Sequence, residues 1–206
     1  MFLHFKKLLS QKECQEIACF FFNQRLLKKQ IYTEANTSDT FPEGRKNTEV
    51  YRTPSIRCRV PPLHLQKIIE KVQERVSSFI KEELLHTYLH IILYKKDSFL
   101  PKHNDSGAHE HTVDVCVAKN NPNTQWPFYI CDPSESRTEE IFMNIGDGYH
   151  FKGTTCPHWR PPLEDEWQLQ VFFHYVTKDG EYYSEALEEM AEHREGYYNL
   201  DIVLDP

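Results

Sequence analysis

The chain has 206 residues, of which 39% are hydrophobic and 13% aromatic, which is enough for one folded domain with a substantial core. Its formal net charge of −7 at pH 7 disfavours a broad electrostatic footprint on nucleic acid. Residues 1–12 lack the continuous apolar stretch of a signal peptide, and Phe20–Phe22 is too short to span a bilayer. We therefore expect one globular domain over residues 1–206 that binds neither nucleic acid nor membrane.

Cysteine usage indicates the redox compartment. The cysteines are scattered and include no Cys-x-x-Cys pair: Cys14, Cys19, Cys58, Cys116, Cys131 and Cys156. This pattern favours reduced intracellular thiols over a disulfide framework or a zinc knuckle. Together with the start of the chain, it predicts a cytoplasmic protein.

The first 85 residues are predicted to be mainly helical. Ser10–Glu13 has the form of a capping box and precedes an apolar stripe, which predicts a helix over Ser10–Lys29. Ala35–Asn47 is polar and is predicted to be a loop that could cover a site, and Val50–Val60 is predicted to be a strand pair or an extended run. Apolar residues then recur at three- and four-residue steps, which predicts a second helix from Pro61 to about Leu84 or Leu85.

From residue 86 the pattern changes to short apolar segments separated by turn signals. The predicted strands are Leu89–Leu93, Thr112–Val117, Phe128–Cys131, Glu140–Met143, Tyr149–Phe151 and Gln168–Val176. Such strands indicate an antiparallel sandwich or jelly roll. An acidic helix is predicted around Tyr183–Glu192. Together these elements predict an α+β domain with a helical part (1–85), a jelly-roll core (86–178) and a short helical cap (179–206).

Three side chains form a candidate metal-binding set. His103 and Asp105 are one residue apart, so on extended backbone both project from the same face. His158 would complete a set of two imidazoles and one carboxylate, which leaves positions on a metal open and is associated with non-haem Fe(II) oxygenases. His-x-Asp alone is a weak signal in a chain with 11 histidines, so the surrounding sequence carries the argument.

The surrounding sequence resembles the 2-oxoglutarate- and Fe(II)-dependent dioxygenases, specifically the prolyl-4-hydroxylase-like branch. In that family a strand ending in Tyr precedes Pro-x-His-x-Asp, and a Gly-Asp-x-x-x-Phe-x-Gly turn precedes the distal His. The matching positions here are Tyr94, Pro101, His103, Asp105, Gly146, Asp147, Phe151, Gly153 and His158. The resemblance covers roughly residues 89–176.

This resemblance implies a double-stranded β-helix with iron at its mouth, held by His103, Asp105 and His158. It also implies 2-oxoglutarate and O2 as co-substrates, release of succinate and CO2, and hydroxylation of an aliphatic carbon. The substrate is expected to be a small molecule or a peptide: a free amino acid, a peptidyl proline or another protein side chain, or a small metabolite.

The 2-oxoglutarate site departs from the family pattern. The relatives usually place Lys or Arg about ten residues after the distal His, where this chain has Gln168. Arg160 is the replacement candidate, because it can share the inward face of His158 and clamp a carboxylate. Its alternative is a surface arginine stacked on Trp159 or Trp167. Tyr94 would add a hydroxyl hydrogen bond, or be an ordinary strand aromatic. Further candidates are Lys152, Arg57, Arg59 and Gln170.

Other interpretations compete with this one. His109 and His111 form a His-x-His pair that, with His158, could make a cupin-like site for Zn, Mn or Fe. A non-catalytic binding module on the same jelly roll is a further alternative. His150 and His174 are interpreted as core or barrel-lining residues. The predicted pocket walls are Trp126, Phe128 and Phe151.

Overall fold

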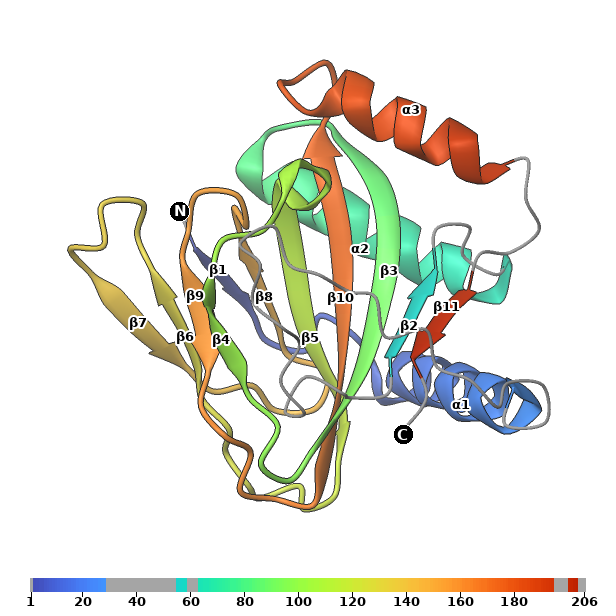
Figure 1. The fold of residues 1–206 in the computed structure, drawn as a ribbon, viewed down its shortest axis with the longest axis vertical. Coiled ribbons are helices and arrows are strands. Elements are labelled where there is room, and N and C mark those ends of the chain that lie inside the picture. Colours follow the sequence, from blue (N-terminus) through green and yellow to red (C-terminus); the bar gives the residue numbers. More distant parts are fainter. Residues whose placement is uncertain (1, 29–54, 59–62, 195–199, 204–206) are drawn as a thin grey trace.

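The computed structural model describes residues 2–28, 55–58, 63–194 and 200–203. In this part of the chain two antiparallel β-sheets face each other, and two helices cover the outer side of the larger sheet (Figure 1). The loop predicted over residues 35–47 lies outside the described residues, as do residues 50–54 of the predicted strand Val50–Val60.

Helix α1 (Gln11–Lys28) begins at the predicted capping box. The backbone N–H of Ser10 donates to Glu13 Oε2 at 2.7 Å, and the N–H of Glu13 donates to Ser10 Oγ at 3.3 Å. These bonds satisfy N–H groups that have no partner within the helix. The prediction of this helix is confirmed to within one residue at each end.

Helix α2 (Leu63–Ile80) buries its apolar stripe but ends earlier than predicted. Its buried residues are Leu65, Ile68, Ile69, Val72 and Val76. Lys81 follows with a φ of 61°, a left-handed conformation that stops a helix, and its N–H donates to Ser77 O at 2.8 Å. The predicted end near Leu84 or Leu85 was wrong, because those residues begin strand β3.

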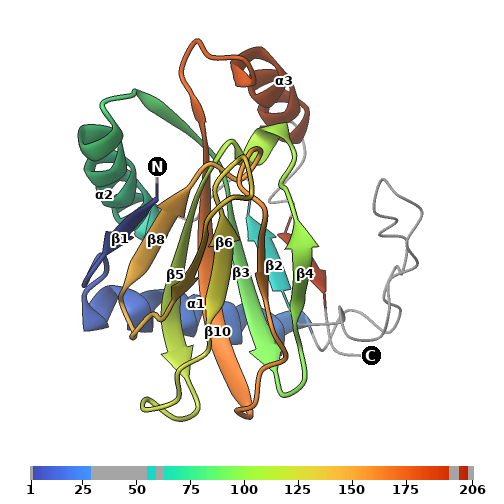
Figure 2. The ribbon, with the colours of Figure 1, turned by 90° about the vertical axis from the view of Figure 1, so that its left-hand side faces the viewer.

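The two sheets assemble strands from distant parts of the chain. In the described residues the large sheet has the order β1 (Leu3–Phe5), β8 (Gly148–Phe151), β5 (His111–Lys119), β10 (Trp167–Thr177), β3 (Leu84–Lys95), β2 (Ser55–Cys58) and β11 (Leu200–Val203). The small sheet has the order β4 (Leu100–His103), β9 (His158–Arg160), β6 (Phe128–Cys131) and β7 (Thr138–Ile141). Figure 2 turns the small sheet toward the viewer.

The sequence predicted some strands closely, misplaced the ends of others and missed three short ones. β5, β6, β8 and β10 match their predictions closely, whereas β3 extends beyond the predicted Leu89–Leu93 at both ends and β7 begins two residues before the predicted Glu140. Strands β1, β4 and β9 were not predicted. Each has three or four residues, too few to show an alternating pattern.

The central strands are buried on both faces, and the faces differ in chemistry. In β5, Val113, Val115 and Val117 join the apolar cluster formed with α1 and α2. The alternating residues Asp114 and Cys116 face the small sheet, where Asp114 pairs with β9 and Cys116 packs with residues of β6. The interior between the two sheets is therefore partly polar. The candidate functional site is built from residues that line this interior.

One end of the sandwich is covered by the short 3-10 helix η2 (Gly107–His109) and by α3 (Tyr183–Arg194) (Figure 1). η2 lies so close to the residues before α3 that a Cβ on Gly107 would sit 2.5 Å from the ring of Tyr182. Across residues 2–28, 55–58, 63–194 and 200–203, no helix has both the length and the apolar character required to cross a bilayer.

Phe173 tests the packing of the large sheet on the helices. Its side chain is fully buried in the cluster between sheet and helices. We expect Phe173→Ala to lower the free energy of unfolding by about 3–5 kcal/mol, through lost burial and a residual cavity. Urea denaturation followed by circular dichroism measures the change. Phe142→Ala is the matched control, because that side chain is 41% exposed; equal losses in both variants would contradict the assignment of the core.

Candidate metal centre

His103, Asp105 and His158 lie together at the end of the sandwich covered by η2. His103 ends β4 and lies opposite His158, the first residue of β9. His103 Nε2 is 3.4 Å from Asp105 Oδ1, and His158 Nε2 is 3.7 Å from the same oxygen. One ligand atom from each residue lies within 4.8 Å of the others. The predicted set therefore converges on one point.

Backbone hydrogen bonds hold Asp105 in place beyond the end of β4. The N–H of Asp105 donates to Gly153 O at 2.9 Å, and the N–H of Gly153 donates to Glu110 O at 2.9 Å. Thr112 Oγ1 donates to Asp105 Oδ2 at 3.1 Å. Since Thr112 takes Oδ2, the other oxygen, Oδ1, is the one that faces both histidines.

Both imidazoles are oriented by backbone carbonyl groups two residues before them in the chain. His103 Nδ1 donates to Pro101 O at 2.8 Å, and His158 Nδ1 donates to Cys156 O at 2.9 Å. A carbonyl accepts only, so each Nδ1 carries a proton and each Nε2 is the nitrogen available to a metal ion. Metal-ligating histidines are commonly fixed in this way.

The protonation states suit metal binding. Burial lowers the pKa of His158 to about 4, so this imidazole is neutral near pH 7. Burial acts to raise the pKa of Asp105, but the neighbouring histidines and the Thr112 hydroxyl outweigh it and keep that pKa below its ordinary value. For His103, burial opposes and Asp105 favours the charged form, and the net effect raises its pKa. A cation bound here would displace that proton.

The donor set fits a divalent transition metal. Two neutral imidazoles and one carboxylate match the arrangement that leaves neighbouring coordination positions open. Within the described residues this is the one group of three or more potential ligand side chains that converges. The protein thus presents the residues that an Fe(II) ion would need.

The competing His-x-His site is not formed. His111 Nδ1 lies 3.0 Å from His150 Nε2, and its Nε2 lies 3.0 Å from Thr177 Oγ1. His109 contacts Ser106 and the ring of His174 instead. Neither joins His158, so the prediction of a three-histidine cupin site was wrong. A His-x-His spacing places both rings on one face only if both residues are in a strand, and His109 belongs to η2.

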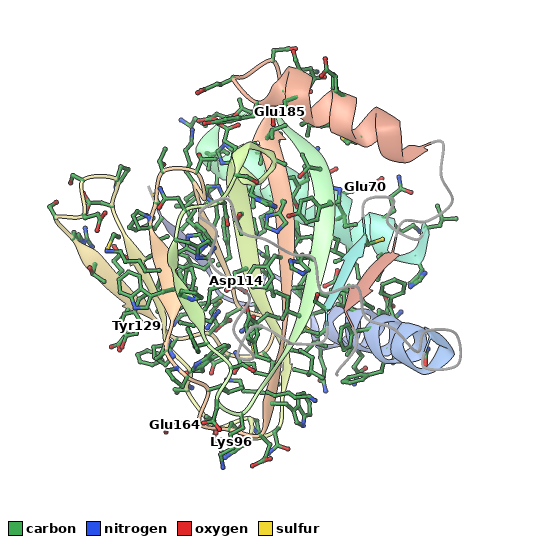
Figure 3. All side chains as sticks on the ribbon, in the orientation of Figure 1. Glu70, Lys96, Asp114, Tyr129, Glu164 and Glu185 are labelled. Atoms are coloured by element: carbon green, nitrogen blue, oxygen red, sulfur yellow. The ribbon has the colours of Figure 1, made fainter. Side chains whose placement is uncertain are left out.

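Arg160 is buried between the sheets and does not stack on Trp159 or Trp167. It is 1% exposed, its Nη2 pairs with Asp114 Oδ2 at 2.5 Å, and its guanidinium lies over the rings of Trp126 and Phe128 at 4.6 and 4.9 Å. Figure 3 labels Asp114, the partner of Arg160, near the middle of the molecule. The inward orientation predicted for Arg160 is observed, and its surface alternative was wrong.

Several buried polar atoms of Arg160 and of the two central strands β5 and β10 have no hydrogen-bond partner within the described residues. They are Arg160 Nε, Asp114 Oδ1, and both amide atoms of Gln170, which is fully buried on β10. Burial raises the pKa of Asp114, although Arg160 opposes this shift. A buried polar group without a partner costs about 1–3 kcal/mol, so unpaired atoms such as those of Arg160 and Asp114 indicate a place for water or a ligand.

The remaining predicted residues lie in three different surroundings. Tyr94 is buried beside Trp126, with 4.9 Å between ring centroids. Phe128 and Phe151 pack against the His158 ring and belong to the core between the sheets. Lys152 lies 3.8 Å from Glu82 and from Glu110, in a separate cluster of charges.

His150 and His174 are both buried, in agreement with their interpretation as core or lining residues. Arg59 lies outside the described residues, and the side chain of Arg57 is not among those described.

Thr112 and Asp114 were missed as site residues, whereas Gln170 had been named as a further candidate for the 2-oxoglutarate site. A signal for them existed, because each is a polar residue at alternate positions in an otherwise apolar strand. Which strand they would face depends on the pairing register, which the sequence did not reveal.

Comparisons with known proteins identify the fold. No family model matches the chain, and no curated protein matches it. A prolyl hydroxylase from Trichoplax adhaerens, solved with a peptide fragment of the hypoxia inducible factor oxygen degradation domain, is similar with a TM-score of 0.63 and 13% identity, over 89% of this chain and 86% of that one.

Two further solved structures are similar to this chain. HygX from Streptomyces hygroscopicus, with nickel and 2-oxoglutarate bound, is similar with a TM-score of 0.59 and 12% identity over 86% of this chain and 82% of that one. SnoN, a non-haem α-ketoglutarate-dependent epimerase from nogalamycin biosynthesis, is similar with a TM-score of 0.61 and 12% identity over 85% of this chain and 77% of that one. The predicted α+β fold with a double-stranded β-helix core is confirmed.

Gly153 tests the backbone support of Asp105. A Cβ at this position would overlap Asp105 Oδ2 and lie 2.7 Å from the backbone oxygen of His109. We expect Gly153→Ala to displace the carboxylate and weaken Co(II) binding by roughly tenfold or more. A spectroscopic titration measures the affinity, and circular dichroism verifies the fold. The neighbouring Thr154→Ala is the control; unchanged affinity in Gly153→Ala would show that Asp105 tolerates the shift.

Proposed function

We propose that this chain is an Fe(II)- and 2-oxoglutarate-dependent dioxygenase that hydroxylates an aliphatic carbon and releases succinate and CO2. The observation that carries the proposal is the convergence of His103, Asp105 and His158, with both Nε2 atoms and one carboxylate oxygen directed to a common point. The fold shared with 2-oxoglutarate-dependent enzymes supports it.

In this proposal His103, Asp105 and His158 hold the iron. Iron, 2-oxoglutarate and O2 together supply oxidising chemistry that amino-acid side chains lack. The chain contributes ligand orientation and shielding. The Pro101 and Cys156 carbonyls fix the two imidazoles, while the buried rings of Phe128 and Phe151 keep water from one side of His158.

Arg160 is proposed to bind the distal carboxylate of 2-oxoglutarate. It lies two residues beyond His158 on β9, so the two side chains start about 7 Å apart along the same face of the strand. That separation suits a five-carbon dicarboxylate bound at the metal by one end. Arg160 Nε and Gln170 Nε2 have no partner among the described residues, and both are donors that a carboxylate needs.

Tyr94 is proposed to complete this subsite with a hydroxyl hydrogen bond to the same carboxylate, because the Trp126 ring contacts both Tyr94 and Arg160. Asp114 makes the subsite unusual for a dicarboxylate, because its carboxylate already offsets the charge of Arg160. We therefore expect the binding of the distal carboxylate to depend on hydrogen bonds as well as on net charge.

The proposed substrate is an amino acid, a peptidyl residue or a small metabolite. A peptide is supported by the similar prolyl hydroxylase, which was solved with a peptide fragment. A small molecule is supported by the similar epimerase SnoN, which also shows that this fold hosts a different reaction outcome. Screening amino acids, proline-containing peptides and small metabolites for coupled succinate formation tests this part of the proposal.

Asp105 tests the proposed function directly. Anaerobic titration with Fe(II) and 2-oxoglutarate is expected to produce a weak visible charge-transfer band in the wild-type protein. Asp105→Ala is expected to abolish both the band and iron-dependent succinate formation, because the metal loses the one carboxylate that the protein supplies. Glu164→Ala, an exposed residue at the opposite end of the molecule from α3, is the control (Figure 3). No band in the wild-type protein would favour a non-catalytic jelly-roll module.

Arg160 tests the 2-oxoglutarate subsite. Removing Arg160 alone would leave Asp114 as a buried unpaired charge, so Arg160→Gln is combined with Asp114→Asn. Losing a charge-assisted hydrogen bond costs about 1.5–3 kcal/mol, so we expect the double variant to bind 2-oxoglutarate roughly 10- to 100-fold more weakly.

Asp114→Asn alone keeps the arginine and serves as the control. It is expected to bind 2-oxoglutarate at least as tightly as the wild-type protein does. Affinities follow from titrating the charge-transfer band. If the double variant bound 2-oxoglutarate with wild-type affinity, Arg160 would not bind the distal carboxylate, and another cationic side chain would have to do so.

A further inference from the structure

Thr112 makes two hydrogen-bond contacts that link the metal centre to the large sheet. Its Oγ1 lies 3.1 Å from Asp105 Oδ2 and 3.1 Å from His174 Nδ1. Thr112 is on β5 and His174 is its partner on the neighbouring strand β10. Both residues are buried, so water does not compete for these contacts.

The chemistry of the three groups dictates the direction of both bonds. An ionised carboxylate accepts only, so the Thr112 hydroxyl donates to Asp105. A hydroxyl has a single hydrogen, so its contact with His174 must have Nδ1–H as the donor. The chain of donors therefore runs from His174 to Thr112 to Asp105, and it requires His174 to carry its proton on Nδ1.

We propose that Thr112 and His174 form a positioning relay that holds Oδ2 of Asp105 away from the metal and leaves Oδ1 as the single ligand atom. The proposal rests on the proposed function, because it assumes that Asp105 binds a metal ion. Neither Thr112 nor His174 would touch the metal. They act by fixing the orientation of the carboxylate plane, as outer-sphere hydrogen bonds do in other metal sites.

Surrounding rings hold His174 in the orientation that the relay needs. The His174 ring stacks on Phe172 with an interplanar angle of 6°, and its centroid is 4.6 Å from that of Tyr88 and 4.4 Å from that of His109. The imidazole is 5% exposed. A ring packed on these sides cannot turn freely, so its Nδ1 stays directed at Thr112.

Co(II) is the probe, because its visible spectrum reports both binding and coordination number. We expect Thr112→Val, which keeps the side-chain shape but removes the hydroxyl, to weaken Co(II) binding about 10- to 100-fold. The visible absorption is expected to change as well, because a carboxylate released at Oδ2 can bind the metal through both oxygens. Thr112→Ser, which restores the hydroxyl, is expected to recover the wild-type spectrum and most of the affinity.

Thr87→Val is the matched control. Thr87 is also buried and donates a hydrogen bond, to Ala108 O at 2.9 Å, without contact to the metal group. It controls for the general cost of removing a buried hydroxyl near η2, and we expect its Co(II) affinity and spectrum to match those of the wild-type protein.

His174 gives a second, independent test. His174→Asn keeps an N–H donor near the position of Nδ1, whereas His174→Leu removes it. We expect the asparagine variant to bind Co(II) more tightly than the leucine variant, with thermal unfolding verifying that both fold.

The two proposals fail in different ways. If the wild-type protein does not bind Co(II), the metal site and the relay are both overturned. If it binds Co(II) but Thr112→Val and His174→Leu show wild-type affinity and spectra, the relay alone is overturned.

Discussion

The candidate site depends on the antiparallel pairing of β4 with β9. In this pairing His103 lies opposite His158, and their ring centroids are 4.3 Å apart. Neighbouring strands are about 4.8 Å apart, so residues in direct register place their side chains within reach of one metal ion. Asp105 joins them because the chain turns after β4 and its N–H bonds to Gly153. A shift of one residue in this register would turn one of the two histidines to the opposite face of the sheet.

The structure gathers the buried polar groups of its central strands on the face toward the small sheet. Toward α1 and α2, strands β5 and β10 present a continuous apolar surface that stabilises the fold. Toward the small sheet they present Thr112, Asp114, Gln170 and His174, all buried. Burying such groups opposes folding unless each finds a partner. The face toward α1 and α2 thus supplies the larger apolar core, while the opposite face combines these polar groups with a second apolar cluster.

How far the sequence predicted the structure depended on the range of the interactions involved. The capping box of α1 and the apolar period of α2 are local, and both helices were predicted. The end of α2 was missed because Leu84 and Leu85 continue the helical period while belonging to β3. Strands β4 and β9 were missed because each is defined by a partner more than fifty residues away, and three or four residues carry no period of their own.

By itself, the sequence predicted the candidate ligand types: a His-x-Asp pair, a distant histidine and a glycine-bearing turn between them, in an order that resembles the 2-oxoglutarate-dependent dioxygenases, indicate a metal site of two imidazoles and one carboxylate. Only the tertiary structure decided the surroundings of those ligands. It excluded His109 and His111 from the site, paired Arg160 with Asp114, and connected Asp105 through Thr112 to His174. The physical reason is that a ligand set is specified by residue type and spacing, whereas each supporting contact depends on strand register and on which face of a sheet a side chain occupies.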